Sequence, residues 1–266
     1  MDIADPALVE MFDRQSAAFF LAARERPWAD IRVDDDVIWG TTGLPLANFN
    51  GATQTAFTEA TADDRIETVL RRFRDERIPM VWWVGPTATP ADLADRLVAH
   101  GLVREESAPG MAVSLDGWSP PVPRDGITTD LVADAAAFHV AMQIMFAGFE
   151  MPAEILPDFE SRFADFCIGP RAIQRVFLAR REGRPVATSL GFVLDGVVGI
   201  YNVATLPDAR RRGAGLAVTV AAMADAQARG ARSAILESSP MARPMYERIG
   251  FRQICEVTVL SGAFDD

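Results

Sequence analysis

The C-terminal third of the chain constrains the fold most, because extended and helical segments alternate there in an order that few architectures accommodate. Three strand-like runs occur at 174–179, 185–194 and 197–205, separated by Glu182-Gly183 and Asp195-Gly196. Glycine-containing pairs between such runs are typical of β-hairpin turns. The sequence therefore predicts three consecutive antiparallel strands.

Helical and extended segments then alternate towards the end of the chain. Four elements are expected: a helix at 214–229, a strand at 233–237, a helix at 243–249 and a strand at 251–260. Gly230 and Gly250 follow the two helices, where a left-handed residue commonly ends a helix. Helices packed on a mixed, mostly antiparallel sheet define an α/β (α+β) domain.

Upstream, two helices and a linker are expected. Residues 133–148 carry apolar side chains at helical spacing, and 152–166 reads as a second, broken helix. Residues 116–126 are rich in Pro and Gly and show no periodicity. This segment is expected to link a domain at 1–115 to a domain at 127–266.

The first half repeats part of the same pattern. A hairpin is expected from 37–41 and 46–51, followed by a helix at 63–75, a strand at 79–85 and a helix at 91–100. The spacing from Pro90 to Gly101 differs by one residue from that between Pro240 and Gly250. We interpret the two halves as a diverged internal duplication, although strand–helix–strand units recur in any α/β protein.

Composition and charge exclude several classes of function. The net charge of −11 argues against a nucleic-acid-binding protein. Lysine is absent, which excludes Schiff-base chemistry on lysine and a Walker A phosphate loop. The two histidines lack metal-ligand spacing, so no metal site is expected. Short apolar runs, an N-terminal stretch without a secretory pattern and two isolated cysteines indicate a cytoplasmic protein with free thiols and no membrane span.

The chemistry is concentrated in one turn. The segment Arg210-Arg211-Arg212-Gly213-Ala214-Gly215-Leu216 lies between the strand ending at Thr205 and the helix that follows. Glycines permit close approach of a ligand to the backbone, and a helix start presents unpaired N–H groups and the positive end of the dipole. Such a turn is suited to a phosphate or diphosphate. Taken alone, it also fits an arginine-rich turn at the start of an ordinary helix.

This turn, with its preceding Pro207, resembles the Arg/Gln-x-x-Gly-x-Gly/Ala signature of the GNAT (Gcn5-related N-acetyltransferase) superfamily. A second segment, from Ala242 through Tyr246 to Gly250-Phe251, resembles that family's other signature, with Met245 where leucine is usual. The resemblance covers about residues 127–262. It implies a tandem arrangement of two GNAT-like domains, of which the N-terminal copy is degenerate.

The resemblance implies binding of acetyl-CoA and transfer of its acetyl group to an amine without a covalent enzyme intermediate. The pantetheine arm is then expected beside the strand at Val203, Ala204 and Thr205, with the pyrophosphate on the turn. Tyr246 matches the tyrosine that protonates the departing thiolate, provided that the site lowers its pKa somewhat. Tyr201, Val203 and Thr205 are expected to share one face of their strand.

Other positions are less determined. Glu237 ends a strand beside the site and could act as general base, directly or through water, or be a solvated carboxylate. Ser239 stands where the family often has an asparagine that contacts the cofactor arm. His139 is expected to be a buried core histidine. Glu150 could hold a cationic acceptor or lie in a surface loop.

The first half lacks these residues. Ala60-Thr61-Ala62 precedes its helix in place of the glycine turn, and Leu97 stands where Tyr246 stands in the second half. We therefore expect one active module. The alternatives are a non-catalytic acyl-CoA-binding or sensor protein, and a transferase that uses aminoacyl-tRNA, which the acidic charge disfavours. The acceptor, a small molecule or peptide amine, and a monomeric or homodimeric state are not specified by the sequence.

Overall fold

The computed structural model describes residues 6–105, 107–122, 124–170 and 172–264, and these divide into two compact units. The C-terminal unit comprises the described residues of 111–252. The N-terminal unit comprises those of 6–110 together with 253–264. Each unit has its own set of neighbouring strands and its own hydrophobic core.

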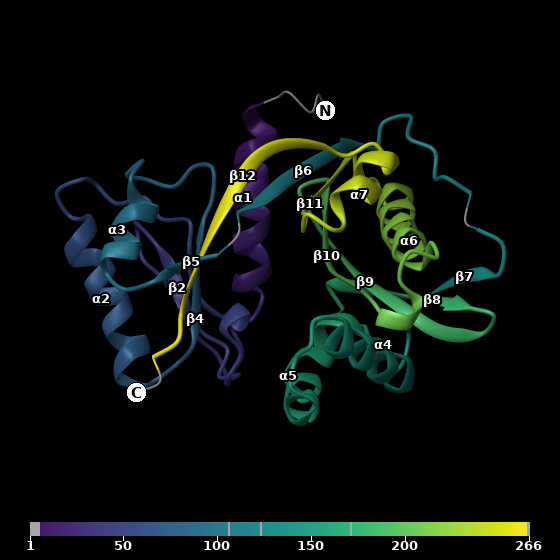
Figure 1. The fold of residues 1–266 in the computed structure, drawn as a ribbon, viewed down its shortest axis with the longest axis horizontal. Helices are drawn as coiled ribbons and strands as arrows, with labels where there is room; N and C mark the ends of the chain where they lie inside the picture. Colours follow the sequence, from purple (N-terminus) through teal and green to yellow (C-terminus); the bar gives the residue numbers. More distant parts are fainter. Residues whose placement is uncertain (1–5, 106, 123, 171, 265–266) are drawn as a thin grey trace. The chain divides into compact units, whose positions relative to one another are not determined.

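The C-terminal unit has the expected α/β architecture (Figure 1). Its elements are β6 (Ala108–Ser114, from Met111), β7 (Ile127–Leu131), α4 (Ala135–Gly148), α5 (Leu156–Cys167), β8 (Gln174–Arg181), β9 (Arg184–Leu194), β10 (Val197–Thr205), α6 (Ala214–Ala228), β11 (Ser233–Glu237) and α7 (Arg243–Ile249). The strand order is β6-β11-β10-β9-β8-β7. The pairs among β7 to β10 are antiparallel, whereas β10 and β11 are parallel. The predicted hairpins are confirmed, and Glu182 and Asp195 adopt positive φ in their turns.

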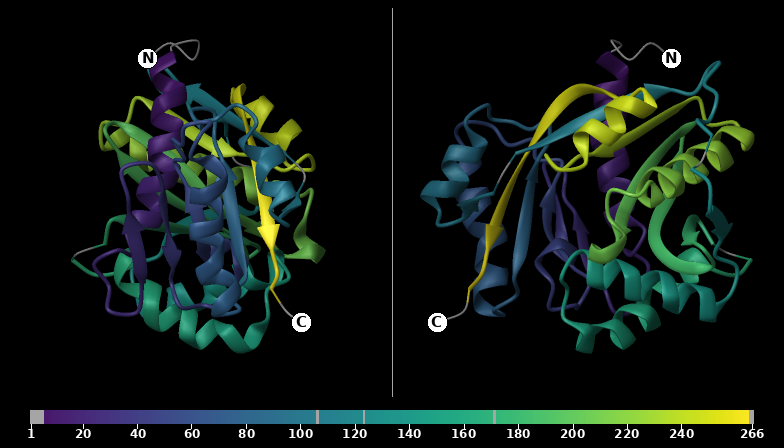
Figure 2. Two further views of the ribbon diagram at one scale, coloured as in Figure 1. Left: turned by 90° about the vertical axis from the view of Figure 1, so that its left-hand side faces the viewer. Right: turned by 45° about the vertical axis from the view of Figure 1, so that its right-hand side comes forward.

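Helices cover both faces of this sheet (Figures 1 and 2). On one face α6 packs on β8, β9 and β10, and the hydroxyl of buried Ser189 donates to the carbonyl of Val218. On the other face α4 packs on β9 and β10. The end of α4 approaches β10 so closely that a Cβ on Gly148 would stand 2.8 Å from the Cβ of Ala204. The sheet thus separates an α6 face from an α4 face.

The N-terminal unit repeats the order hairpin, helix, parallel strand, helix. Its elements are α1 (Pro6–Leu21), β1 (Asp30–Val33), β2 (Ile38–Thr41), β3 (Asn50–Thr53), α2 (Ala62–Asp75), β4 (Met80–Val84), α3 (Leu93–Ala99), β5 (Val103–Arg104) and β12 (Arg252–Gly262). The strand order is β1-β2-β3-β4-β12, with β5 also pairing β12. Strands β2 and β3 pair antiparallel, as β9 and β10 do in the other unit. Strands β3 and β4 pair parallel, as β10 and β11 do. The two halves therefore share the topology expected of a duplication.

The units do not divide at residues 116–126, where the sequence predicts a linker. Strand β12 follows α7 directly, yet it pairs with β4 and places the fully buried Leu260 in the N-terminal core. Met111, Val113 and Leu115 instead lie in the C-terminal core. Composition could not reveal this exchange, because strand partners are chosen by long-range packing.

Part of the expected linker is docked on the C-terminal unit. The side-chain amide of Gln227 donates to the carbonyls of Leu115 and Trp118, at 2.6 and 3.0 Å. The indole N–H of Trp118 donates to the carbonyl of Ile249 at 3.3 Å. These contacts fix the first residues after β6 against α6 and α7.

The sequence analysis missed α1, which carries a buried carboxyl group. Asp13 is 5% exposed and accepts hydrogen bonds from the hydroxyl and the backbone N–H of Thr87. A Cβ on Gly85 would stand 1.9 Å from Asp13 Oδ1, so glycine makes room for the carboxyl group. Burial raises the pKa of Asp13, and the two bonds from Thr87 offset only part of that effect.

This raised pKa predicts a pH-dependent effect of Asp13→Asn on stability. A carboxyl group whose folded pKa exceeds its unfolded pKa contributes stability below the unfolded value and loses that contribution as pH rises through the folded value. The amide keeps an acceptor for Thr87 and cannot ionise. The variant should therefore gain melting temperature relative to wild type as pH rises from about 4 to 7. Thermal melts of Asp75→Asn, an exposed carboxylate, provide the control; a pH-independent difference for Asp13→Asn would contradict the assignment.

Candidate active site

The site begins where two parallel strands part. Strands β10 and β11 pair through Val197, Val198 and Gly199, opposite Ser233, Ala234 and Ile235, and the register ends there. The remaining part of β10, to Thr205, stays paired with β9 on its other edge. The edge of β10 that follows Gly199 thus has backbone groups available to an extended ligand.

A β-bulge in β10 changes which side chains face the site. Tyr201 pairs with Leu190 and Ala204 with Thr188, so two residues of β10 oppose the single residue Ser189. Asn202 takes up the irregularity with φ 52°. Directly paired residues point to the same face, which places Tyr201 with Ala204 on the α4 face. The expectation that Tyr201, Val203 and Thr205 share a face is therefore wrong for Tyr201.

The bulge brings Tyr201 to the same face as Glu237. The tyrosine ring folds back over Gly199, where a Cβ would stand 2.6 Å from the phenol oxygen. Gly199 pairs with Ile235, so Glu237, two residues on, lies on that α4 face as well. Burial raises the pKa of Tyr201, and the negative charge of Glu237 raises it further. Glu237 is itself exposed at the end of β11.

The turn before α6 has the features of an anion site. Gly213 is the N-cap of α6 with φ 96°, and Arg211 also has positive φ, at 62°. The first hydrogen bond of the helical ladder is donated by Ala217 to Gly213, so the N–H groups of 214–216 precede the ladder. A Cβ on Gly215 would stand 3.2 Å from Thr205 Oγ1. The first turn of the helix contains no acidic residue.

The three arginines of the turn differ in what they contact. Arg210 is partly buried, and its guanidinium donates to the carbonyls of Thr205 and Gly148, at 3.3 and 3.2 Å. It thereby ties the end of β10 to the end of α4. Arg211 and Arg212 are exposed. Arg212 also lies close enough to Asp208 to help lower that carboxyl's pKa, after the larger effect of Arg184.

Tyr246 lies in the core on the α6 side of the sheet. It is 4% exposed, and its ring meets that of Phe251 edge-on with centroids 5.8 Å apart. Within the described part of the chain, its hydroxyl has no hydrogen-bond partner. Burial raises its pKa, in the direction opposite to the one expected from the sequence. The phenol therefore stays protonated to high pH.

Ser239 contributes to the start of α7. Its Oγ accepts from the backbone N–H of Ala242 at 3.3 Å, and its carbonyl accepts from Ala242 and Arg243. The neighbouring Ser238 is buried and donates to the Ser239 carbonyl. This local turn holds α7, and with it Tyr246, at the end of β11.

His139 lies in the second turn of α4, and Glu150 follows the end of that helix. His139 is exposed, and its Nδ1 lies 2.8 Å from Oε1 of Glu160 on α5, so the expected core histidine is wrong. It lies one residue from buried Phe138, about 100° around the helix and off the apolar stripe. Glu150 is exposed with φ 55°, directly after the exposed Phe149.

The corresponding region of the N-terminal unit is closed. Strands β3 and β4 part after Ala52 and Trp82, but a parallel bridge between Ala56 and Thr89 joins the chain again. The space contains Trp82, which is fully buried, packs edge-on against Phe57 and donates to Thr55. Backbone hydrogen bonds of Thr89 with Thr55 and Phe57 thus engage groups that an extended ligand arm would need.

The start of α2 also differs from that of α6. Thr58 accepts from the N–H of Thr61 through its hydroxyl and from that of Ala62 through its carbonyl. Asp63 and Asp64 occupy the first turn, where their charges interact with the helix dipole and oppose a phosphate. The start of α2 therefore differs in backbone and charge from the glycine turn before α6.

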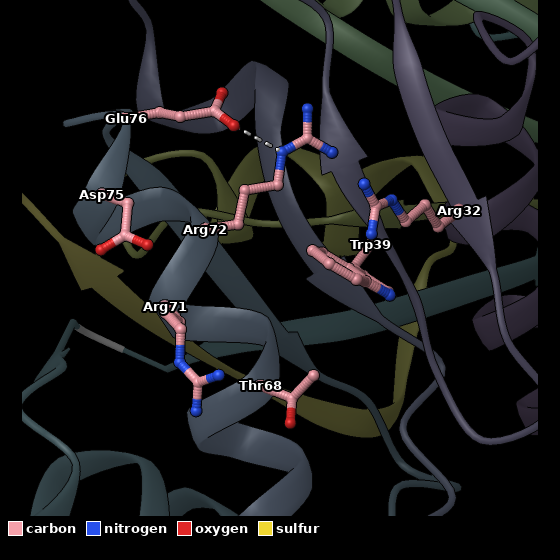
Figure 3. A pocket seen from close by; sticks show the side chains of 7 residues that line it. All are labelled: Arg32, Trp39, Thr68, Arg71, Arg72, Asp75 and Glu76. Atoms are coloured by element: carbon pink, nitrogen blue, oxygen red, sulfur yellow. Dashed lines mark hydrogen bonds and ion pairs between the residues drawn. The ribbon is translucent and has the colours of Figure 1, made fainter.

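Figure 3 shows a pocket of about 300 Å³ in the N-terminal unit, between α2 and the β1–β2 hairpin. Arg32 stacks over Trp39, 4.8 Å from the ring centroid. Arg72 is paired with Asp30 and Glu76. Carboxylates thus already balance most of the positive charge at this pocket.

Other features of the described residues bear on function. No helix there is long and apolar enough to cross a membrane, and no group of three or more His, Cys, Asp or Glu side chains could hold a metal ion. Both cysteines are free thiols, as expected. Burial raises the pKa of the Cys167 thiol to about 12, which makes it a poor nucleophile.

The C-terminal unit thus combines a parted pair of parallel strands with a glycine turn at the start of a helix. Residues 138–251, which include the parted strands and the glycine turn, match the model of the acetyltransferase (GNAT) family, so the C-terminal unit has an acyltransferase fold. Comparison with curated proteins finds no match.

Solved structures with this fold span both units. A GCN5-related N-acetyltransferase from Kribbella flavida has a TM-score of 0.74 at 24% identity, over 94% of this chain and 95% of that chain. One from Sphaerobacter thermophilus has a TM-score of 0.64 at 16% identity, over 100% and 95%. A tandem GNAT protein from the clavulanic acid biosynthesis pathway has a TM-score of 0.57 at 12% identity, over 100% and 98%. At these identities the likeness concerns the fold.

Proposed function

We propose that the C-terminal unit transfers the acetyl group of acetyl-CoA to an amine acceptor. The observation that carries the proposal is the parted β10–β11 pair next to the Gly213–Gly215 turn. The pyrophosphate would bind the N–H groups of Gly213 to Leu216, with Arg211 and Arg212 adding positive charge. The pantetheine arm would pair with the backbone of Val203, Ala204 and Thr205.

The residues present fit such a donor. Gly215 keeps the turn open towards Thr205, and Arg210 braces the end of β10 against Gly148. Ser239 would act through its turn at the start of α7 rather than through a long side chain. The N-terminal unit, whose corresponding space contains Trp82, would bind no acyl-CoA and serve as a degenerate copy.

The reaction would be a direct attack. The amine nitrogen forms a bond to the thioester carbonyl carbon, and the C–S bond breaks. A backbone N–H near Val203–Thr205 would stabilise the oxyanion that develops. The amine loses a proton to Glu237, directly or through water, and the CoA thiolate receives one from the Tyr246 hydroxyl. Glu237 and Tyr246 lie on opposite faces of the sheet, so acceptor and donor would enter from opposite sides.

The α4 face would therefore hold the acceptor. Glu237 and Tyr201 stand at the parted strands on this face, and Glu150 follows α4. The carboxylates of Glu237 and Glu150 favour a cationic amine, which must lose its charge before attack. The experiment is thiol release from acetyl-CoA across a panel of amines and amino-terminal peptides, with products identified by mass. A broad panel without product, despite tight binding of acetyl-CoA, would favour a sensor instead.

Gly215→Val should abolish the thermal stabilisation by acetyl-CoA. The wild type should gain about 2.7 kcal/mol at a ligand concentration 100 times Kd. The valine side chain would stand against Thr205 Oγ1 and Met245 Sδ, 3.2 and 3.6 Å from the glycine's Cβ position, and narrow the turn. Gly215 is the better test than Gly213, whose φ of 96° strains any other residue. Ala228→Val, exposed at the far end of α6, is the matched control; an undiminished shift in Gly215→Val would exclude the turn as the pyrophosphate site.

A further inference from the structure

Arg124 lies beside the glycine turn although it is far from it in sequence. A Cβ on Gly213 would stand 3.0 Å from Arg124 Cδ and 3.4 Å from its Cγ. The aliphatic stem of Arg124 therefore lies against the turn at Gly213, where a Cβ would crowd it. Neither composition nor motif spacing predicts this contact, because Arg124 falls in the segment that resembles a linker.

The backbone around Arg124 is anchored, so the stem is held in place. The carbonyl of Arg124 accepts from the N–H of Ile127 at 3.2 Å, and that of Gly126 accepts from Glu182 at 2.9 Å. Ile127 is 8% exposed and packs with Ala209, Ala214 and Ala217 beneath the turn. The first residue of β7 thus joins the arginine to the start of α6.

The guanidinium of Arg124 is available to a ligand. Arg124 is exposed, and the described residues offer it neither an ion pair nor a side-chain hydrogen bond. Arg211 and Arg212 are exposed on the same turn. Asp208 lies near Arg212, but Arg124 has no such carboxylate among the described residues, and like charges on one turn repel. A phosphate group would supply a counter-charge and could accept two parallel N–H bonds from arginine.

We infer that Arg124 binds a phosphate group of CoA. It would supply a positive charge from outside the glycine turn to the same ligand that the turn binds. The inference rests on the proposed function. CoA offers two sources of this chemistry, the pyrophosphate and the ribose 3′-phosphate, and dephospho-CoA lacks only the latter. Comparison of the two ligands therefore identifies the group that Arg124 contacts.

The experiment measures Kd for CoA and dephospho-CoA by calorimetry with wild type, Arg124→Gln, Arg124→Lys and Arg229→Ala. A charge-assisted hydrogen bond of about 1.5–3 kcal/mol corresponds to a loss of about 10- to 100-fold in affinity for Arg124→Gln. Arg124→Lys should recover part of it. Arg229→Ala removes the same charge from the other end of α6, about 20 Å away, and should change Kd less than twofold.

Each outcome has a defined reading. A loss for CoA but not for dephospho-CoA assigns Arg124 to the 3′-phosphate, and an equal loss for both assigns it to the pyrophosphate; both support the inference. The inference is overturned if Arg124→Gln binds both ligands within twofold of wild type. It is also overturned if Arg229→Ala loses as much affinity as Arg124→Gln. Either outcome leaves the proposed function standing. A wild type that binds neither ligand overturns both. Unchanged melting of the ligand-free Arg124→Gln verifies that the fold is intact.

Discussion

A fragment of residues 116–252 should fail to fold, whereas a fragment of residues 108–252 should unfold cooperatively. The two differ by eight residues that contain β6. Met111, Val113 and Leu115 are 0%, 7% and 1% exposed in the C-terminal core. Burying such side chains contributes about 1.5–3 kcal/mol each, and the three together approach the 5–15 kcal/mol of a whole domain.

The comparison isolates the contribution of β6. Both fragments end at Arg252, where the C-terminal unit ends, so neither carries β12 as an unpaired tail. Both fragments retain Trp118 and its hydrogen bond to Ile249. The shorter fragment lacks Leu115, whose carbonyl accepts from the side-chain amide of Gln227. Thermal unfolding by circular dichroism and dispersion of amide resonances would report the difference. Cooperative unfolding of 116–252 at the melting temperature of the longer fragment would contradict the assignment of β6 to this core.

Local sequence signals predicted most of the elements because each depends on near neighbours. The expected strand at 233–237 and helix at 243–249 coincide with β11 and α7. Two-residue turns and helix ends are determined by residues that tolerate positive φ, and Gly183, Gly196, Gly230 and Gly250 all adopt it. The predicted hairpins and the helices α2 to α7 were therefore accessible from the sequence, whereas α1 and β1 were missed.

The pairing of distant strands was not accessible in this way. The sequence analysis placed the domain boundary by composition, at 116–126. Strand β12 pairs with β4, between 174 (258 − 84) and 182 (262 − 80) residues away in the chain, and the order β6-β11 in the other unit is equally non-local. No local property of residues 253–262 distinguishes these partners, because strand pairing is decided by long-range packing.

The site shows the same division between local and long-range information. The glycines of the anion turn were visible in the sequence, because close approach and positive φ both require them. The side-chain roles were not. Arg210 serves the ends of β10 and α4, and the bulge at Asn202 moves Tyr201 to the α4 face. An asparagine within an alternating strand was the one available signal for that bulge, since asparagine tolerates left-handed φ.

Tyr246→Phe should lower kcat by about 100-fold or more while leaving the Kd for acetyl-CoA near the wild-type value, since general acid catalysis typically contributes 10²–10⁴-fold. The ring packs on Phe251 in either variant, and the hydroxyl has no partner among the described residues. Its removal should therefore cost little stability. Thiol release at saturating acetyl-CoA, with ligand-free melting as a check on folding, measures the effect.

The control must distinguish a role of Tyr246 as general acid from a role in packing. Phe251→Leu disturbs the fully buried neighbour of the ring but keeps the phenol, so it should lower the melting temperature more than kcat. The pH profile adds a second distinction. Because burial raises the pKa of Tyr246, the acid stays protonated above the ordinary phenol pKa of about 10, and wild-type kcat should not decline below that pH through loss of this proton. Wild-type kcat in Tyr246→Phe would make Tyr246 a packing residue, and the thiolate would then have to take its proton from water in the opening between β10 and β11.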